Sequence, residues 1–269
     1  MTTINESGFL SEEISEFIKS HRAEHAHYFD LCEDLNTFSH HMLLGLQIHN
    51  EYLPEIFVAM YFARALSNFQ GTVLLSERGM NNESKILLRA LLEVMFAVVA
   101  ISKDKEVATQ LVEADILERK DALKAFGRQA SAGIEFFSDQ KVTEELARLE
   151  WEVANAEKER PTKEITKRYL AEKAGVVTTY DSAYKLLSAS VHAPVRDLEQ
   201  YLDVDPNGNI SSLLWGPNKT EIALVLMTGA HNLLAVLDAV SKIFDLPITT
   251  EHQQLLDRYK KLGESFPHG

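Results

Sequence analysis

A charged pair interrupts an otherwise apolar segment in the first half of the chain. Arg89 and Glu93 lie four residues apart within ILLRALLEVMF. Residues with this spacing share one face of a helix, so the guanidinium and the carboxylate are expected side by side. Such a pair can present charges to a cavity, or it can join helices as a structural ion pair. Burial of either charge without a partner is costly, so the pair predicts an arranged polar site.

A second polar series lies in the segment YDSAYKLLSASVH. Tyr184, Ser188 and His192 recur at every fourth position and form a stripe along one helix face. Ser188 and His192 can hydrogen-bond, but no Gly-x-Ser-x-Gly turn precedes the serine, which argues against a hydrolase triad. His192 can serve as a general acid or base, as a ligand contact or as a cap for helix carbonyls.

The two segments are combined in one site hypothesis. If the protein is an enzyme, the candidate catalytic residues are His192, Arg89 and Glu93. The candidate ligand-binding residues are Glu83, Tyr184 and Ser188. We assign no metal ligand and no cofactor. Arg89, Glu93 and His192 are expected to converge, because each is a polar interruption of an apolar helix and needs a partner.

Histidines concentrate near the N-terminus. Six of the ten are His21, His25, His27, His40, His41 and His49. His21 and His25, with Glu24 nearby, would form a transition-metal site if a neighbouring helix completed the ligand set. The motif His-Glu-x-x-His and the repeated Glu-x-x-His pair of di-iron proteins are both absent, and an exposed polar face explains the histidines equally well. A His/carboxylate metal-binding protein is therefore the second alternative function.

The charge balance restricts the partners. The chain has 27 basic and 40 acidic residues, a net charge of −13, and no segment of it is net basic. DNA binding is therefore disfavoured, whereas RNA is left open. The single cysteine, Cys32, excludes an internal disulfide framework. Because the N-terminus lacks a signal-peptide pattern and the uncharged stretch 222–237 is short for a membrane span, we expect a cytoplasmic protein without membrane contact.

Helical spacing of apolar residues predicts an all-α fold, a bundle of about 8–10 helices that forms a single domain over 1–269. Segments 54–101 and 176–246 include helices that are apolar around nearly their whole circumference and should form the core. Between them, 102–173 holds 14 basic and 16 acidic residues. This composition predicts a charged helical excursion that protrudes as a hairpin, flanks the bundle or pairs with another subunit, so a homo-oligomer is left open. The later segment DVDPNGNISSLLWGPN predicts one irregular region or short hairpin.

Two stretches carry a resemblance to a known family. YFARALSNFQGTVLLSERGMNNESKILLRALLEVMFAVVAI, followed by YDSAYKLLSASVHAPVRDLEQYL, resembles the bacterial family called domain of unknown function 5677, over about residues 55–240. Arg89 and Glu93 match its Arg one helical turn before Glu, and Tyr184, Ser188 and His192 match its Tyr, Ser, His series. The resemblance implies an all-helical intracellular bacterial protein with a polar site built from two distant segments.

Such proteins are similar in outline to HEPN-type helical bundles, some of which are toxins or antiviral effectors. Arg22 and His27 have the Arg-x4-His spacing of HEPN ribonucleases, but no histidine follows Arg89 at that spacing. Two function classes follow. The first is a binding or regulatory protein of a stress or phage-defence system, which holds a small anionic ligand or a protein partner. The alternative is a metal-independent, HEPN-like ribonuclease. The acidic composition favours the first class, and the paired polar stripes favour the second.

Overall fold

Helices account for 79% of the structure, a computed structural model, so the predicted all-α class is confirmed. It describes residues 2–131, 140–159, 164–192 and 195–264. The α-helices are α1 (Ile4–Ser7), α2 (Ile14–Glu24), α3 (Ala26–Gly45), α4 (Leu53–Glu77), α5 (Asn81–Lys103), α6 (Glu106–Ser131), α7 (Gln140–Glu159), α8 (Lys167–Ala174), α9 (Val177–Thr179), α10 (Lys185–His192), α11 (Val195–Leu198), α12 (Ile222–Ile243) and α13 (Thr250–Glu264). The strands are β1 (Leu202–Val204) and β2 (Ile210–Leu213). Short turns of other helix types are η1 (Gly8–Leu10), η3 (Tyr180–Tyr184) and η4 (Glu199–Tyr201).

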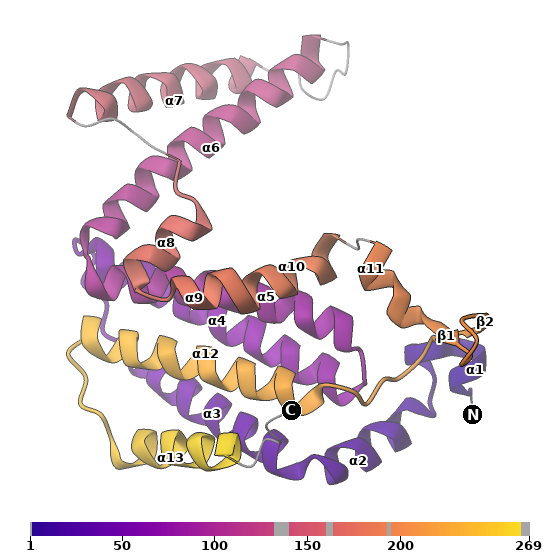
Figure 1. Ribbon diagram of the computed structural model, residues 1–269. Helices are drawn as coiled ribbons and strands as arrows, with labels where there is room; N and C mark the ends of the chain where they lie inside the picture. The colour runs from indigo at the N-terminus through magenta and orange to yellow at the C-terminus, as the bar shows by residue number, and fades with distance from the viewer. Residues whose placement is uncertain (1, 132–139, 160–163, 193–194, 265–269) are drawn as a thin grey trace.

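Helices α4, α5 and α12 lie side by side and form the centre of the bundle (Figure 1). Their contacts bury Phe62, Phe69, Leu91, Leu92 and Leu233 almost completely. Each such side chain contributes about 1.5–3 kcal/mol through removal of apolar surface from water. Helix α3 packs on α12 and α4, and α13 packs on α3, while α8 and α10 pack on α5. The core therefore includes α3 and α8 in addition to the segments that hydrophobicity singles out.

Helix α12 is apolar around most of its circumference. By length and composition it could cross a membrane, and among the described residues it is the one helix with this property. Most of its most apolar stretch is buried inside the bundle, where it contacts α4 and α5. This burial fits a central core helix.

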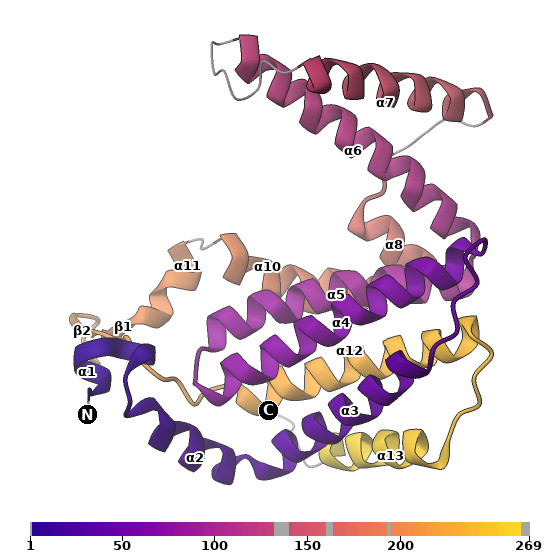
Figure 2. The same cartoon turned by 180° about the vertical axis from the view of Figure 1, so that it is seen from behind.

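Helices α6 and α7 form an antiparallel hairpin that projects from the bundle (Figures 1 and 2). They make up the main part of the predicted charged excursion. Its last part returns to the bundle, because Leu170, Ala171 and Ala174 of α8 are buried and α8 packs on α5. Residues 132–139 and 160–163, where two of the connections in this region fall, lie outside the described residues.

A tight connection makes α4 and α5 antiparallel neighbours. The chain leaves α4 through Gly79, whose φ of 70° lies in the left-handed region that glycine adopts without strain. The amide of Gly79 donates to the carbonyl of Ser76, and the amide of Met80 donates to the carbonyl of Leu75. These bonds satisfy the last carbonyls of α4. Because α5 begins directly afterwards, the middle of α4 lies beside the middle of α5.

The segment predicted as irregular or as a hairpin contains a two-stranded antiparallel sheet. Leu202 pairs with Leu213. In the turn, the Asp205 side chain accepts hydrogen bonds from the amides of Asn207 and Asn209, and Gly208 has a φ of 86°. The Asp-Pro-Asn-Gly sequence thus forms the tight turn that its composition favours.

Candidate functional site

Arg89, Glu93 and Tyr184 form a hydrogen-bonded cluster. Arg89 Nη2 donates to Tyr184 Oη at 2.9 Å, and Tyr184 Oη donates to Glu93 Oε1 at 3.0 Å. A phenol can accept one bond while it donates its single proton, so the two bonds are compatible. Arg89 Nη2 also lies 3.4 Å from Glu93 Oε1, and its guanidinium lies 4.9 Å from the centroid of the Tyr184 ring. The structure therefore brings three of the proposed site residues together.

A π-helical turn carries Tyr184. Between α9 and α10, residues Tyr180–Tyr184 adopt the wider π geometry, which is often found at functional sites. The rings of Tyr180 and Tyr184 stack with centroids 4.9 Å apart and planes 19° apart. Both rings also contact Phe96 of α5. The turn and these aromatic contacts together hold the Tyr184 hydroxyl against the polar face of α5.

The environment of Tyr184 keeps its hydroxyl protonated. Burial raises the pKa of Tyr184 above its usual value, and this outweighs the hydrogen bond from Arg89, which lowers the pKa. The carboxylate of Glu93 raises the pKa further. At neutral pH the side chain is consequently a hydrogen-bond donor to Glu93 and cannot act as a base.

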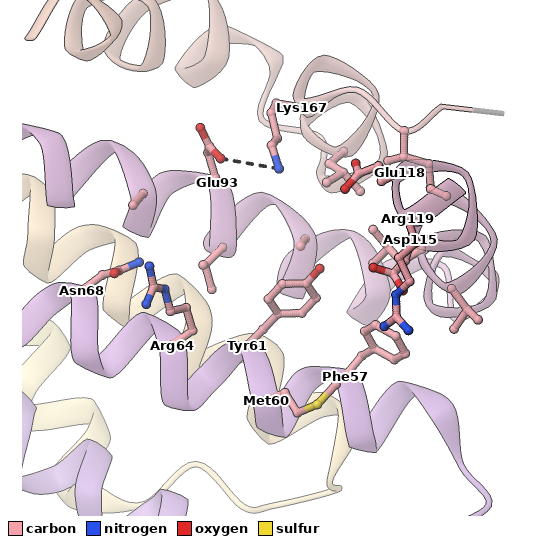
Figure 3. A pocket seen from close by; sticks show the side chains of 18 residues that line it. Phe57, Met60, Tyr61, Arg64, Asn68, Glu93, Asp115, Glu118, Arg119 and Lys167 are labelled. Atoms are coloured by element: carbon pink, nitrogen blue, oxygen red, sulfur yellow. Dashed lines mark ion pairs between the residues drawn. The ribbon is translucent and has the colours of Figure 1, made fainter. Parts of the chain in front are cut away.

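The second carboxylate oxygen of Glu93, Oε2, has a different partner. It lies 3.5 Å from Nζ of Lys167, the first residue of α8 (Figure 3). Glu93 is 25% exposed and Lys167 is 48% exposed, so the pair is open to solvent and to a ligand. Glu93 thus connects α5 both to the π turn and to the start of α8.

A cleft of about 710 Å³ opens on the Lys167 side of Glu93. Helices α4, α5 and α6 and the segment around the start of α8 line it. Its apolar surface includes Phe57, Met60 and Val94. The volume is within the range of small-molecule sites, and a cleft between helices of a bundle is a common place for one.

Two hydrogen-bond donors at one end of this cleft have no acceptor in the described part of the chain. Asn68 of α4 is only 3% exposed, and its Nδ2 atom has no partner among the described residues. Arg64, one helical turn earlier, makes no hydrogen bond or ion pair with any residue that the structure describes. The two side chains lie next to each other (Figure 3). Because buried donors are normally paired, this end is suited to an oxygen acceptor from a ligand.

The opposite end of the cleft is acidic. Arg119 Nε there lies 2.7 Å from Asp115 Oδ2, and Glu118 lies beside this pair (Figure 3). Tyr61 stands between the two ends. Burial raises the pKa of Tyr61, and the charges of Glu118 and Asp115 raise it further, so its hydroxyl is protonated at neutral pH.

The side chains of two other proposed site residues, Ser188 and Glu83, form no hydrogen bond or ion pair with the side chains of Arg89, Glu93 or Tyr184 among the described residues. Ser188 Oγ donates to the backbone carbonyl of Tyr184 at 2.8 Å, a bond within the helix. Glu83 lines a different pocket of about 560 Å³, beside Tyr201 and Trp215. The side chain of His192 is outside the described residues, although its backbone ends α10.

The cleft contains polar residues that the site hypothesis omitted: Tyr61, Arg64, Asn68 and Lys167. A usable signal for three of them is present in the sequence, since Tyr61, Arg64 and Asn68 interrupt the apolar helix LPEIFVAMYFARALSNFQ at spacings of three and four. The criterion that singled out Arg89 and Glu93 applies to them equally. Lys167 lies in a charged segment and has no comparable signal.

The histidines near the N-terminus lie in different parts of the fold. His49 Nδ1 lies 2.8 Å from Glu55 Oε2 at the start of α4. His21 and His25 gather with Glu24 at the end of α2. None of these residues lines the cleft.

Comparison with known protein families identifies the family of this chain. The profile of a family of unknown function (DUF5677) matches residues 55–210, more than half of the chain. The chain belongs to this family. The DUF5677 segment runs from the start of α4 to β2 and contains every residue that we place in the cleft and in the Arg89 cluster. No curated protein and no solved structure matches the chain.

Proposed function

We propose that this chain is a ligand-binding, regulatory protein, and that the cleft between α4, α5 and α6 holds a small molecule by an anionic group. One observation carries the proposal: among the described residues, neither the buried Asn68 amide nitrogen nor the neighbouring Arg64 guanidinium has a partner. Carboxylates and phosphates supply the oxygen acceptors that these two donors require. Phe57 and Met60 then contact the apolar part of the ligand.

The acidic end of the cleft narrows the class of ligand. A long polyanion would meet Asp115 and Glu118, whereas a small molecule with its acidic group at Arg64 and a hydroxyl or ammonium group near Glu118 would not be repelled. The net charge of −13 likewise disfavours RNA binding, because it repels the phosphates. Both features support the binding function over the ribonuclease alternative.

Lys167 connects the cleft with the Arg89 cluster. A ligand oxygen that binds Lys167 competes with Glu93, which then keeps only its contacts to Tyr184 and Arg89. Lys167 begins α8, and Tyr184 directly precedes α10. Occupancy of the cleft would thereby change the contacts that hold both helices on α5. Regulation by such a ligand, in the bacterial cytoplasm and in a stress or phage-defence response, completes the proposal.

A thermal-unfolding screen tests this function. The purified full chain is melted with a panel of small carboxylates, phosphate esters and nucleotides, alongside Arg64→Gln and the control Arg128→Gln. Arg64 is exposed, so its replacement should not prevent folding, and Arg128 is an exposed arginine that does not line the cleft. A true ligand at about 100 times its Kd stabilises wild type by about 2.7 kcal/mol. We expect Arg128→Gln to respond like wild type and Arg64→Gln to lose most of the effect.

Two results would contradict the proposal. One is equal stabilisation of wild type and Arg64→Gln by every compound that acts. The other is cleavage of mixed single-stranded and structured RNA by metal-free wild type but not by His192→Ala, which would instead support the ribonuclease alternative.

A further inference from the structure

His21 is a buried imidazole near the end of α2. It is 0% exposed, and neither Nδ1 nor Nε2 has a partner in the described part of the chain. The carbonyl of Ser76 lies near the ring but outside hydrogen-bond geometry. His25, four residues later, also has a buried Nε2 atom without a partner. Since buried polar atoms are normally paired, two neighbouring imidazoles in this state indicate a place for a ligand.

A carboxylate completes a set of three donors. One ligand atom from each of His21, Glu24 and His25 lies within 4.8 Å of the other two. Helix α2 ends at Glu24, and His25 is the junction residue before α3, with φ −116° and ψ 27°. The two imidazole rings are 4.9 Å apart and nearly perpendicular. The order His-x-x-Glu-His also occurs in zinc enzymes whose histidines hold the metal.

Aromatic rings fix the position of His21. Phe17 stacks on it with centroids 5.1 Å apart, and Phe29 meets it edge-on at 6.1 Å. A ligand side chain that neighbouring packing already orients loses less freedom on binding an ion. The imidazole is therefore preorganised by ring packing alone among the residues that the structure describes.

Lys219 forms an ion pair with the carboxylate of Glu24. Its Nζ donates to Glu24 Oε2 at 2.7 Å, and it lies in the segment that leads from β2 to α12. An ammonium group and a metal ion would repel each other at one exposed carboxylate. Lys219 and an ion consequently compete for Glu24.

We propose that His21, Glu24 and His25 bind a divalent transition-metal ion of the Zn²⁺ class, with solvent in the remaining coordination position. Two imidazole nitrogens and a carboxylate oxygen are a donor set of known three-ligand zinc sites, whereas Mg²⁺ and Ca²⁺ prefer oxygen alone. The site lies before the family match and outside the cleft, so it is independent of the proposed function. Binding releases Lys219 from Glu24 and thereby couples the ion to the segment before α12.

The test is a metal titration of the full chain without an affinity tag, after treatment with a chelator and dialysis. Zn²⁺ binding is measured by calorimetry and Co²⁺ binding by visible absorption. We expect one saturable equivalent in wild type. His25→Ala, which removes one of three ligands, should bind at least about 100-fold more weakly, because loss of a supporting residue outside the ligand shell already costs 10- to 100-fold. The matched control is His27→Ala, since His27 is exposed and two positions away.

A gain of affinity provides an independent arm. Lys219→Gln removes the competing charge and should bind Zn²⁺ about tenfold more tightly, an effect that misfolding cannot imitate. Glu24→Gln, an exposed substitution, should weaken binding while circular dichroism stays that of wild type. The proposal is wrong if wild type shows no saturable binding of Zn²⁺ or Co²⁺, or if folded His25→Ala binds as tightly as wild type.

Discussion

The hydroxyl of Tyr184 lies 3.0 Å from Oε1 of Glu93, although 91 positions separate the two residues in the chain. Arg89 donates to the same hydroxyl, so one phenol joins a cation and an anion that already face each other on α5. The contact fixes the π turn on the central helices and sets the face of Glu93 that remains available to Lys167 and the cleft.

Tyr184→Phe should lower the free energy of unfolding by about 1–2 kcal/mol. The substitution keeps the ring but removes the group that both satisfies Arg89 and donates to Glu93. Tyr180→Phe is the matched control, because Tyr180 stacks on Tyr184 and its hydroxyl makes no hydrogen bond within the described residues. Urea unfolding of the three proteins measures the difference. Equal losses in both variants would mean that the hydroxyl of Tyr184 contributes nothing specific.

Arg89→Met should cost about 1–2 kcal/mol, less than the roughly 3 kcal/mol that loss of a partner costs a fully buried carboxylate. Glu93 is 25% exposed and keeps its contacts to Tyr184 and Lys167. The double variant with Lys167→Met should lose more than the sum of the single losses, since it removes both cations that contact Glu93 among the described residues. A double-mutant cycle in urea measures this coupling, and strict additivity would show that the two cations act on Glu93 independently.

Asn68→Leu should stabilise the protein by about 1 kcal/mol and abolish ligand binding in the cleft. The amide nitrogen of Asn68 is buried and has no partner within the described ranges, and leucine replaces the amide with an apolar side chain of similar size. Asn232→Leu is the comparison, because the Asn232 amide is also buried with no partner in the described structure but does not line the cleft. Thermal melts with and without a compound from the screen distinguish the two variants. Retained binding in Asn68→Leu would remove Asn68 from the proposed site.

Cys32 should not react with a disulfide reagent in the native protein at pH 8. Burial raises the pKa of its thiol from 9.0 to about 12, so only about one thiol in 10⁴ is ionised at that pH. The absorbance of the product that the reagent releases should show one reactive thiol only after the protein is unfolded in urea. Because the folded pKa is the higher one, ionisation of the unfolded chain removes stability as the pH rises from about 9 towards 12. Rapid reaction of the folded protein would show that α3 opens locally.

The sequence by itself determined the all-helical fold class and the polar face of α5. Apolar spacing along 54–101 and 176–246 predicts buried helices, and a separation of four residues places Arg89 and Glu93 together whatever surrounds them. Tyr184 could be selected as polar within an apolar segment for the same reason. These properties are local, because each depends on periodicity within a single helix.

Only the tertiary structure decided which helices meet and therefore what the polar faces contact. The π turn directs Tyr184 at Glu93. The regular spacing of residues in an α-helix does not predict such a turn. Lys167 reaches Glu93 because α8 returns from the charged hairpin to pack on α5, and a charged sequence shows no preference for one partner. The cleft depends on the positions of α4 and α6 relative to α5, which are set by the packing of many side chains and by no single motif.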